Sequence, residues 1–380
     1  MQYQEFGNTG IKLSKLGFGC MRLPMTERDG KAVVDDELAG PLLLRAVELG
    51  VNFFDSHWFY CNFDSQRAVG KALRPVRDRV YISSKTMLRN IEKTEDFADY
   101  LNRTLEQMEL DYLDFYHFPA LSWAAWTDKM LPLKMLDEAE KAKSKGLIRH
   151  LSFSFHSDPD KMKEVIDTGA FASVLGQYNL VDRRNEELFA YAKSKGVGTK
   201  VMGPLMGGVL TDGGKLFLER MGSAASSAAE LALRFCWGLP SVDTVLSGMS
   251  NIQQLEENVK YANSIVEESE WQTLVTKSDQ LKELNDLYCT SCNYCAVCPE
   301  KINIGRVFQL YLQHKLWGLT EAVRTRRESA KGGPWGGPEA YGLHSLPSSC
   351  TECGACMVAC PQDIDIPAEL KRVWPVLLEL

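Results

Sequence analysis

The chain of 380 residues lacks the features of several protein classes. Its formal net charge is -7 and it shows no long basic face, which argues against a nucleic-acid partner because phosphate binding needs a basic surface. Its first residues show no charged stretch followed by an apolar one, and no run approaches the roughly 18 apolar residues of a membrane span. We therefore expect a soluble, cytoplasmic, globular protein without a membrane or nucleic-acid partner.

The cysteines are not spread as a disulfide framework would spread them. Eight of the eleven fall in two short windows near the C-terminus. One window reads CTSCNYCAVCP, with the spacing CxxCxxCxxC, and the other reads CTECGACMVACP, with the spacing CxxCxxCxxxC. Both windows end in Cys-Pro, and their cysteines are Cys289, Cys292, Cys295, Cys298, Cys350, Cys353, Cys356 and Cys360.

This spacing indicates two [4Fe-4S] clusters. Three cysteines two residues apart wrap a loop around three corners of a cubane, and in two-cluster ferredoxins the fourth cysteine ligates the other cluster. Zinc also uses CxxC pairs, but four cysteines within ten or eleven residues, each group ending in Cys-Pro, fit iron-sulfur better. We assign Cys289, Cys292, Cys295 and Cys360 to one cluster, and Cys350, Cys353, Cys356 and Cys298 to the other.

The chain before the cysteines alternates short β-type runs with amphipathic stretches, which is typical of a parallel α/β fold. The runs lie at 16–19, 52–55, 80–85, 113–118, 148–154, 172–178, 197–203 and 243–248, and helical stretches include 36–49 and 95–109. Eight such strands predict a (β/α)8 TIM barrel. We expect this α/β barrel over 1–285 and a ferredoxin-like domain over 286–380.

A doubly wound sheet is the main alternative, and it predicts a glycine fingerprint after the first strand. The first run continues as GFGCMRLP, which lacks that spacing. In a barrel the chemistry lies at the carboxyl ends of the strands. The polar residues at those ends are Asp55, Lys85, His117, Ser154 and Gln177.

Several segments resemble the aldo/keto reductase family, among them FGNTGIKLSKLGFGCMRLP, VNFFDSHWFY, YISSK, GQYNLVDRRNEEL and VLSGMSNIQQLEENV. The cysteine module is similar to that of the ferredoxin-fused branch of this family. The resemblance implies a (β/α)8 barrel that binds NAD(P)H without a Rossmann fold and reduces carbonyls by hydride transfer. It also implies a catalytic tetrad of Tyr, Lys, Asp and His.

By position, the resemblance makes Tyr60, five residues after Asp55, the general acid that protonates the carbonyl oxygen. Lys85 and Asp55 tune it, because a nearby ammonium group favours the phenolate of a tyrosine whose unperturbed pKa is about 10. The histidine is displaced. The slot three residues after Tyr116 holds Pro119, and His117 lies one layer deeper on the same face of the strand.

His117 therefore either helps to polarise the substrate or fills the core. Lys200 faces the same interior if its strand is regular, and turns outward if it is not. An inward Lys200 would form a deeper polar pocket with His117.

The resemblance also implies a nucleotide site. Ser154 and Gln177 would hold the nicotinamide carboxamide. The pyrophosphate would lie along Gly203, Pro204, Leu205 and Gly207, and the adenosine against Gly248, Met249, Ser250, Gln254, Glu257 and Asn258. Ser250 stands where NADPH-preferring members commonly have arginine, so the sequence favours NAD(H) over NADP(H).

Between the cysteine windows we expect a helix over 305–327 and a loop over 330–342, which is rich in turn formers. The charged run at 324–328 is a solvated face or a docking site for an acidic electron-carrier protein.

We weigh three functions for the chain. The first is an oxidoreductase whose NAD(P)H-linked chemistry on a small carbonyl or alcohol is coupled to electron relay through the clusters. The second is a conventional reductase with structural clusters. The third is a non-redox barrel, a lyase, dehydratase or isomerase, that uses His117 and Lys200.

Overall fold

The computed structural model describes residues 1–380 except 157, 265 and 325–346, and the side chains of 282 and 283. The expected loop over 330–342 and most of the charged run after residue 324 lie outside the described residues. The chain divides into two compact units. The first comprises Met1–Tyr178, Arg183–Pro204 and Cys236–Glu268, and the second comprises Asn179–Asp182, Leu205–Phe235 and Ser269–Leu380.

The first unit contains a closed barrel of eight parallel strands, which confirms the predicted fold. In chain order the strands are β3 (Leu16–Gly19), β6 (Phe53–Asp55), β7 (Tyr81–Lys85), β8 (Leu113–Phe118), β9 (Ile148–Ser154), β10 (Ser173–Gln177), β11 (Gly198–Met202) and β12 (Thr244–Ser247). Each matches its predicted run to within one residue at either end.

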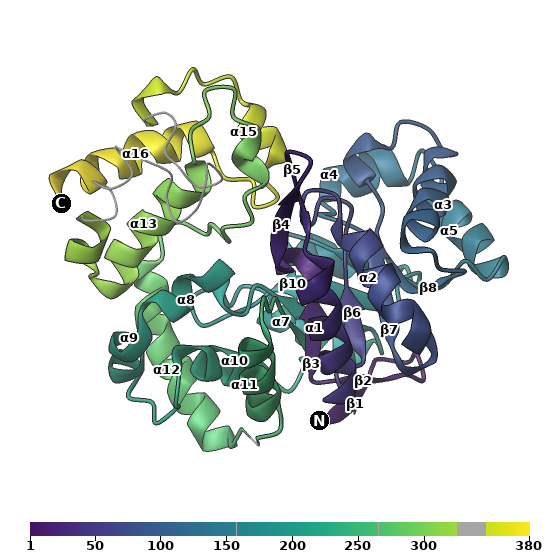
Figure 1. Ribbon diagram of the computed structural model, residues 1–380, viewed down its shortest axis with the longest axis horizontal. Helices are drawn as coiled ribbons and strands as arrows, with labels where there is room; N and C mark the ends of the chain where they lie inside the picture. The colour runs from purple at the N-terminus through teal and green to yellow at the C-terminus, as the bar shows by residue number, and fades with distance from the viewer. Residues whose placement is uncertain (157, 265, 325–346) are drawn as a thin grey trace. The chain divides into compact units, whose positions relative to one another are not determined.

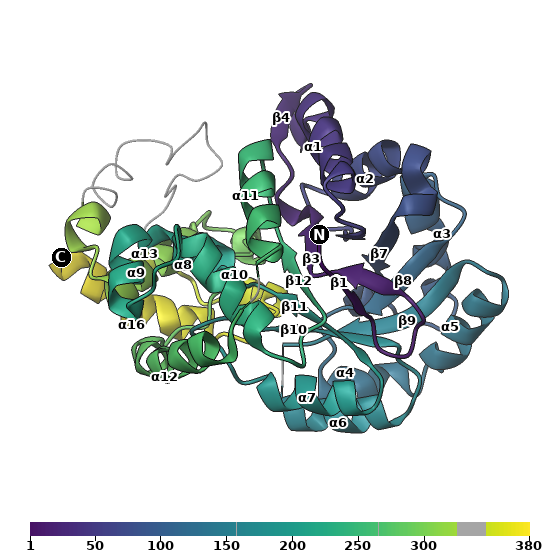
Figure 2. The same cartoon turned by 90° about the horizontal axis from the view of Figure 1, so that it is seen from below.

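Helices alternate with these strands along the chain and lie on the outside of the barrel (Figures 1 and 2). They begin where capping residues satisfy free backbone N–H groups. The Asp35 side chain, for example, accepts from the N–H groups of Glu37 and Leu38. The helices are α1 (Asp36–Glu48), α2 (Ser65–Leu73), α3 (Asp96–Met108), α4 (Trp123–Ala125), α5 (Met135–Ser144), α6 (Pro159–Asp167), α7 (Glu186–Ser194) and α11 (Ile252–Ala262).

A hairpin of β1 (Tyr3–Glu5) and β2 (Lys12–Ser14) contributes to the core of the barrel. Its apolar residues join strand residues that point inward, and together they form one buried cluster of Phe6, Ile11, Leu13, Phe53, Phe115, Leu175 and Leu246. Burial of aromatic and aliphatic side chains at this density supplies most of the stability of such a core. A second hairpin pairs β4 (Met25–Arg28) with β5 (Lys31–Val34).

The second unit contains the cysteine module together with the segment that follows β11. Its helices are α8 (Val209–Asp212), α9 (Gly214–Met221), most of α10 (Ala228–Gly238), most of α12 (Glu268–Leu284), α13 (Ile304–Trp317), α15 (Ala355–Ala359) and α16 (Ile366–Glu379). The helix expected over 305–327 is interrupted, because Gly318 ends α13 in the left-handed conformation with a φ of 65°. Helical residues resume at 320–324.

Short 3-10 turns connect several elements, at Cys20–Arg22, Arg74–Arg79, Leu88–Asn90, Met206–Gly208, Tyr294–Val297 and Pro347–Ser349. A π-helical turn at Trp126–Met130 follows α4. Among the described residues, no helix combines the length and the apolar character that a membrane span requires.

Candidate functional site

A buried ion pair joins the ends of the second and third barrel strands. Asp55 ends β6, Lys85 ends β7, and each is about 3% exposed. The Lys85 ammonium donates to the Asp55 carboxylate and to the Ser56 carbonyl, and it lies 3.4 Å from the Tyr60 hydroxyl. The Ser83 hydroxyl donates to the other carboxylate oxygen of Asp55. The structure therefore brings together the three residues expected to act as acid, cation and anion.

Tyr60 is placed by an unusual turn. The three residues after it, Cys61, Asn62 and Phe63, all have positive φ angles, of 51°, 57° and 69°. Non-glycine residues rarely adopt this conformation, and each costs of order 1–3 kcal/mol unless its surroundings impose it. Asp64 closes the turn by accepting from the Val34 N–H at 2.8 Å. Such strain is concentrated at functional sites, which supports the assignment of Tyr60.

His117 and Lys200 lie against each other inside the barrel. The Lys200 ammonium is 2.8 Å from His117 Nε2 and donates to the Ser173 hydroxyl at 2.7 Å. His117 Nδ1 lies 3.1 Å from the Ser84 carbonyl, to which it donates. Both His117 and Lys200 are fully buried. Lys200 thus faces inward, and of the two orientations that the sequence left open this is the one the structure shows.

The surroundings of Lys200 are mostly aromatic. Its ammonium lies 5.4, 5.5 and 4.9 Å from the ring centroids of Phe6, Phe53 and Phe115. Burial is the main reason that its pKa falls from 10.5 to about 7, with Asp55 opposing the shift and Lys85 adding to it. Burial, followed by the charges of Lys200 and Lys85, also lowers the pKa of His117 well below its usual value. His117 is therefore a neutral imidazole at neutral pH.

The residues expected to hold the nicotinamide lie at the ends of two adjacent strands. The Ser154 hydroxyl, at the end of β9, accepts from the Ala120 N–H at 3.2 Å. Gln177 ends β10, and its side-chain amide lies so close to Gly203 that a Cβ there would be 2.3 Å from Nε2. Gly203 has a φ of 66°. A hydroxyl and an amide beside a bare backbone fit a carboxamide ligand.

The residues expected to contact the adenosine follow β12. Gln254 accepts from the Ser250 N–H at 2.9 Å, and Asn258 donates to the Ser247 hydroxyl at 3.1 Å. Met249 is buried, and Glu257 accepts from Gln253. The side chain of Arg22 lies over Gly248, with its Cδ 3.4 Å from the position of an added Cβ. Arg22 is a basic residue that cannot be found from the sequence around Ser250, because it comes from the turn after β3.

Pro204 ends the β11 segment of the first unit and is buried, whereas Leu205 and Gly207 belong to the second unit. A Cβ on Gly207 would lie 2.3 Å from the Thr290 carbonyl and 2.9 Å from Ser291 Cβ. The contact with Thr290 and Ser291 of the cysteine module therefore accounts for the absence of a side chain at Gly207.

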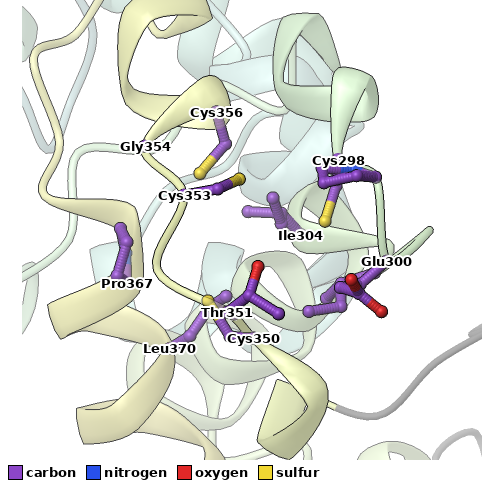
Figure 3. A pocket seen from close by; sticks show the side chains of 12 residues that line it. Cys298, Glu300, Ile304, Cys350, Thr351, Cys353, Gly354, Cys356, Pro367 and Leu370 are labelled. Atoms are coloured by element: carbon purple, nitrogen blue, oxygen red, sulfur yellow. The ribbon is translucent and has the colours of Figure 1, made fainter.

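Four cysteines line one pocket of the module. Figure 3 shows the sulfur atoms of Cys353 and Cys356 on one side of this space and that of Cys298 on the other, with Cys350 completing the set. Burial, followed by contributions that include the Cys298 and Cys350 thiols, raises the pKa of Cys356. Apolar residues, among them Ile304 and Leu370, line the remaining wall.

The other four cysteines line a second pocket. Cys289, Cys292 and Cys295 lie on one loop, and Cys360 comes from the far window. Burial, followed by contributions that include the Cys292 and Cys360 thiols, raises the pKa of Cys289 to about 12. Thiols so crowded become thiolates when a positively charged centre binds, which is the condition that iron provides. Each pocket is therefore lined by the four cysteines that the sequence predicts as the ligands of one cluster.

Comparison with known proteins agrees with this geometry. Residues 15–279 match the model of the aldo/keto reductase family, and residues 288–365 match that of the 4Fe-4S dicluster domain. The chain is 24% identical to an uncharacterized oxidoreductase, YqkF, from Bacillus subtilis, over 70% of this chain and 92% of that protein. It is 27% identical to L-galactose dehydrogenase from Arabidopsis thaliana, over 68% of this chain and 87% of that protein.

Among solved structures, the holo form of the aldo-keto reductase AKR11C1 from Bacillus halodurans superposes with a TM-score of 0.62. The two are 25% identical, and the match covers 73% of this chain and 96% of the other. The thermostable aldo-keto reductase Tm1743 matches with a TM-score of 0.60 at 22% identity. The second match supports the fold alone.

The exchange of the fourth cysteine between the windows can be tested with Cys298→Ala. We expect this variant to lose about four of about eight irons per chain, because one four-cysteine set loses a ligand and the other stays whole. Adding Cys353→Ala should remove no more iron, whereas adding Cys292→Ala should remove the rest. Iron analysis of anaerobically purified protein measures this, with Cys61→Ala as a control that keeps all its iron. The opposite pattern in the double variants would show that Cys298 serves its own window.

Lys200 should make stability depend on pH. Its folded pKa of about 7 is below the usual 10.5, so between these values the unfolded chain holds a proton that the folded chain has released. Stability therefore rises with pH through this window. In urea unfolding at pH 7, 8 and 9, wild type should gain up to about 1.4 kcal/mol per pH unit relative to Lys200→Met. Exposed Lys215→Met is the control, and a difference for Lys200→Met that does not vary with pH contradicts the burial of an ionisable amine.

Proposed function

Because the chain belongs to the aldo/keto reductase family and carries a 4Fe-4S dicluster domain, we propose that it is an NAD(P)H-linked oxidoreductase of a small carbonyl or alcohol. The observation that carries the proposal is the position of the Lys85 ammonium, in contact with both the Asp55 carboxylate and the Tyr60 hydroxyl. An acid, a cation that stabilises its conjugate base, and an anion that holds the cation are what carbonyl protonation requires.

Ser154 and Gln177 would hold a reduced nicotinamide, which would provide hydride for the carbonyl carbon. Tyr60 donates its hydroxyl proton to the carbonyl oxygen, which yields the alcohol. The phenolate left on Tyr60 is stabilised by the ammonium of Lys85, 3.4 Å away. Asp55 keeps that ammonium charged and in place, and solvent returns the proton to Tyr60.

The proposed nucleotide contacts follow from the placement of polar groups at the strand ends. Ser154 and Gln177 would hold the carboxamide, and the backbone of Gly203 would lie beside them. Arg22 beside Gly248 offers a charge that suits a phosphate. This charge weakens the preference for NAD(H), so either nucleotide is compatible with the site. The remaining contacts that we propose in the first unit are Pro204, Met249, Ser250, Gln254, Glu257 and Asn258. The contacts of Leu205 and Gly207, which belong to the second unit, stay predictions from the sequence.

We propose that the clusters act as an electron relay, and that their ligands are the four cysteines that line each pocket. Each [4Fe-4S] cluster passes one electron, whereas a hydride carries two, so the relay requires a centre that separates the two electrons, such as a flavin, between the nucleotide and the clusters. A redox partner, such as an electron-carrier protein, would complete the path. A cytoplasmic setting suits this chemistry, because thiols stay reduced there.

The burial of His117 and Lys200 argues against the non-redox alternative. Both residues are fully buried and bonded to each other, so neither can touch a substrate in this structure, and we do not propose a non-redox barrel. We propose that His117 does not contact the substrate and stabilises the barrel interior below the site through its hydrogen bonds with Ser84 and Lys200. A reductase with structural clusters remains the competing function.

Substitution of Tyr60 by Phe tests the reductase chemistry. We expect Tyr60→Phe to lower kcat for 4-nitrobenzaldehyde by about 10²–10⁴-fold, because the general acid is removed. Binding of NADH and NADPH, followed by quenching of tryptophan fluorescence, should stay within about twofold of wild type. Retention of wild-type kcat in Tyr60→Phe, or absence of nucleotide binding in wild type, contradicts the proposed chemistry.

Mixing the protein with nucleotide under anaerobic conditions distinguishes clusters that act as an electron relay from clusters that are only structural. When oxidised protein is mixed with NADH or NADPH, we expect the paramagnetic resonance signal of reduced clusters to develop. In the Cys298→Ala variant, we expect a paramagnetic resonance signal from one reduced cluster only, the one that keeps its four cysteines. Full carbonyl turnover with no cluster reduction in wild type would favour structural clusters.

A further inference from the structure

A second imidazole lies beside the proposed acid, and the sequence pattern did not identify it. His57 falls between Asp55 and Tyr60 in the chain, two residues after the end of β6, and is 5% exposed. Its ring centroid is 5.5 Å from that of Tyr60, with the two planes at 70°. The ring of Phe59 is 5.3 Å away on an edge. His57 is thus held against the phenol whose proton the reaction uses.

The backbone fixes which nitrogen of His57 carries the proton. The Trp58 N–H donates to His57 Nδ1 at 2.7 Å, so Nδ1 is an acceptor and the neutral ring has its proton on Nε2. Trp58 is itself anchored by its indole N–H, which donates to the Thr104 hydroxyl at 2.9 Å. Among the residues that the structure describes, none accepts a hydrogen bond from His57 Nε2. The Nε2–H group is therefore available to a ligand.

The charge state of His57 suits a neutral donor. Burial, followed by the charge of Lys85, lowers the pKa of His57 well below its usual value. A neutral imidazole beside Lys85 adds no second positive charge to the buried site. It donates one hydrogen bond and does not compete with Tyr60 for the role of acid.

The other candidates for this donor are excluded by their positions. Pro119 occupies the slot three residues after Tyr116 and has no polar side-chain atom. His117 has both ring nitrogens engaged, by the Ser84 carbonyl and the Lys200 ammonium. His57 is the imidazole that remains beside Tyr60.

We propose that His57 is a catalytic residue whose Nε2–H donates a hydrogen bond to the carbonyl oxygen of the substrate, beside the Tyr60 hydroxyl. The inference rests on the proposed function, since it requires a carbonyl at Tyr60. Negative charge develops on the carbonyl oxygen as hydride reaches the carbon, and a fixed N–H donor stabilises that charge more than it stabilises the ground state. The substrate class is an aldehyde or ketone whose oxygen fits between a phenol and an imidazole.

Two substitutions separate hydrogen bonding from packing. His57→Leu removes the donor and keeps a similar volume, and we expect kcat for 4-nitrobenzaldehyde to fall by about 10²–10³-fold, as for loss of one oxyanion donor. His57→Gln places an amide N–H near the former Nε2 and should recover at least tenfold of that loss. Nucleotide affinity should change less than about twofold in both variants. His150→Leu is the matched control, because His150 stacks on Phe115, 5.1 Å away, and is not part of the proposed site.

The outcomes distinguish this inference from the proposed function. If Tyr60→Phe is inactive and His57→Leu keeps kcat within threefold of wild type, the role of His57 is wrong and the reductase stands. Equal losses in His57→Leu and His57→Gln would show that the ring serves packing only. If wild type turns over no carbonyl probe, the proposed function fails, and the ring is then judged by nitrogen resonances of ¹⁵N-histidine-labelled protein. We expect a neutral ring with its proton on Nε2 at pH 7, and an imidazolium or an Nδ1–H ring overturns the inference.

Discussion

The buried pair of Asp55 and Lys85 is the interaction on which the site depends. Two charges removed from water carry a desolvation cost of several kcal/mol per ion, which is recovered only when other groups complete their hydrogen bonds. Ser83 and the Ser56 carbonyl provide these bonds. Loss of one partner from such a pair typically costs about 3–5 kcal/mol, because the other charge stays buried. The pair therefore fixes the ammonium group under Tyr60.

The same ammonium shapes the groups around it. Lys85 lowers the pKa values of both His57 and His117, after the larger effect of burial. Two neutral imidazoles then differ only in what their nitrogens contact. His117 bonds to Lys200 and a backbone carbonyl, which makes it part of the interior, whereas His57 keeps one N–H without a partner among the described residues. Whether a histidine here can bind a ligand therefore depends on the partners of its ring nitrogens and not on its depth in the barrel.

The strands and the strand-end positions of Asp55 and Lys85 could be predicted because they follow local rules, whereas Tyr60 was placed by the family resemblance alone. Apolar runs of strand length set the barrel, and polar residues at strand ends converge at one rim. His57 and Arg22 were missed for a different reason. Each lies in a turn whose conformation depends on contacts distant in sequence, such as that of Trp58 with Thr104 and that of Arg22 with Gly248. The inward orientation of Lys200 needed the partners Ser173 and His117, which only the closed barrel brings together.

The sequence indicated that position 207 needs a small residue, and the structure gives a different reason for it. A small residue in the segment after β11 suggested the close approach of a pyrophosphate. In the second unit, the space that a side chain would fill is occupied by the Thr290 carbonyl, next to Cys289. Asp212 of the same segment accepts from Gln309 and Gln313 of α13. The segment after β11 therefore packs against the loop that carries Cys289, and this packing requires a residue without a side chain at Gly207.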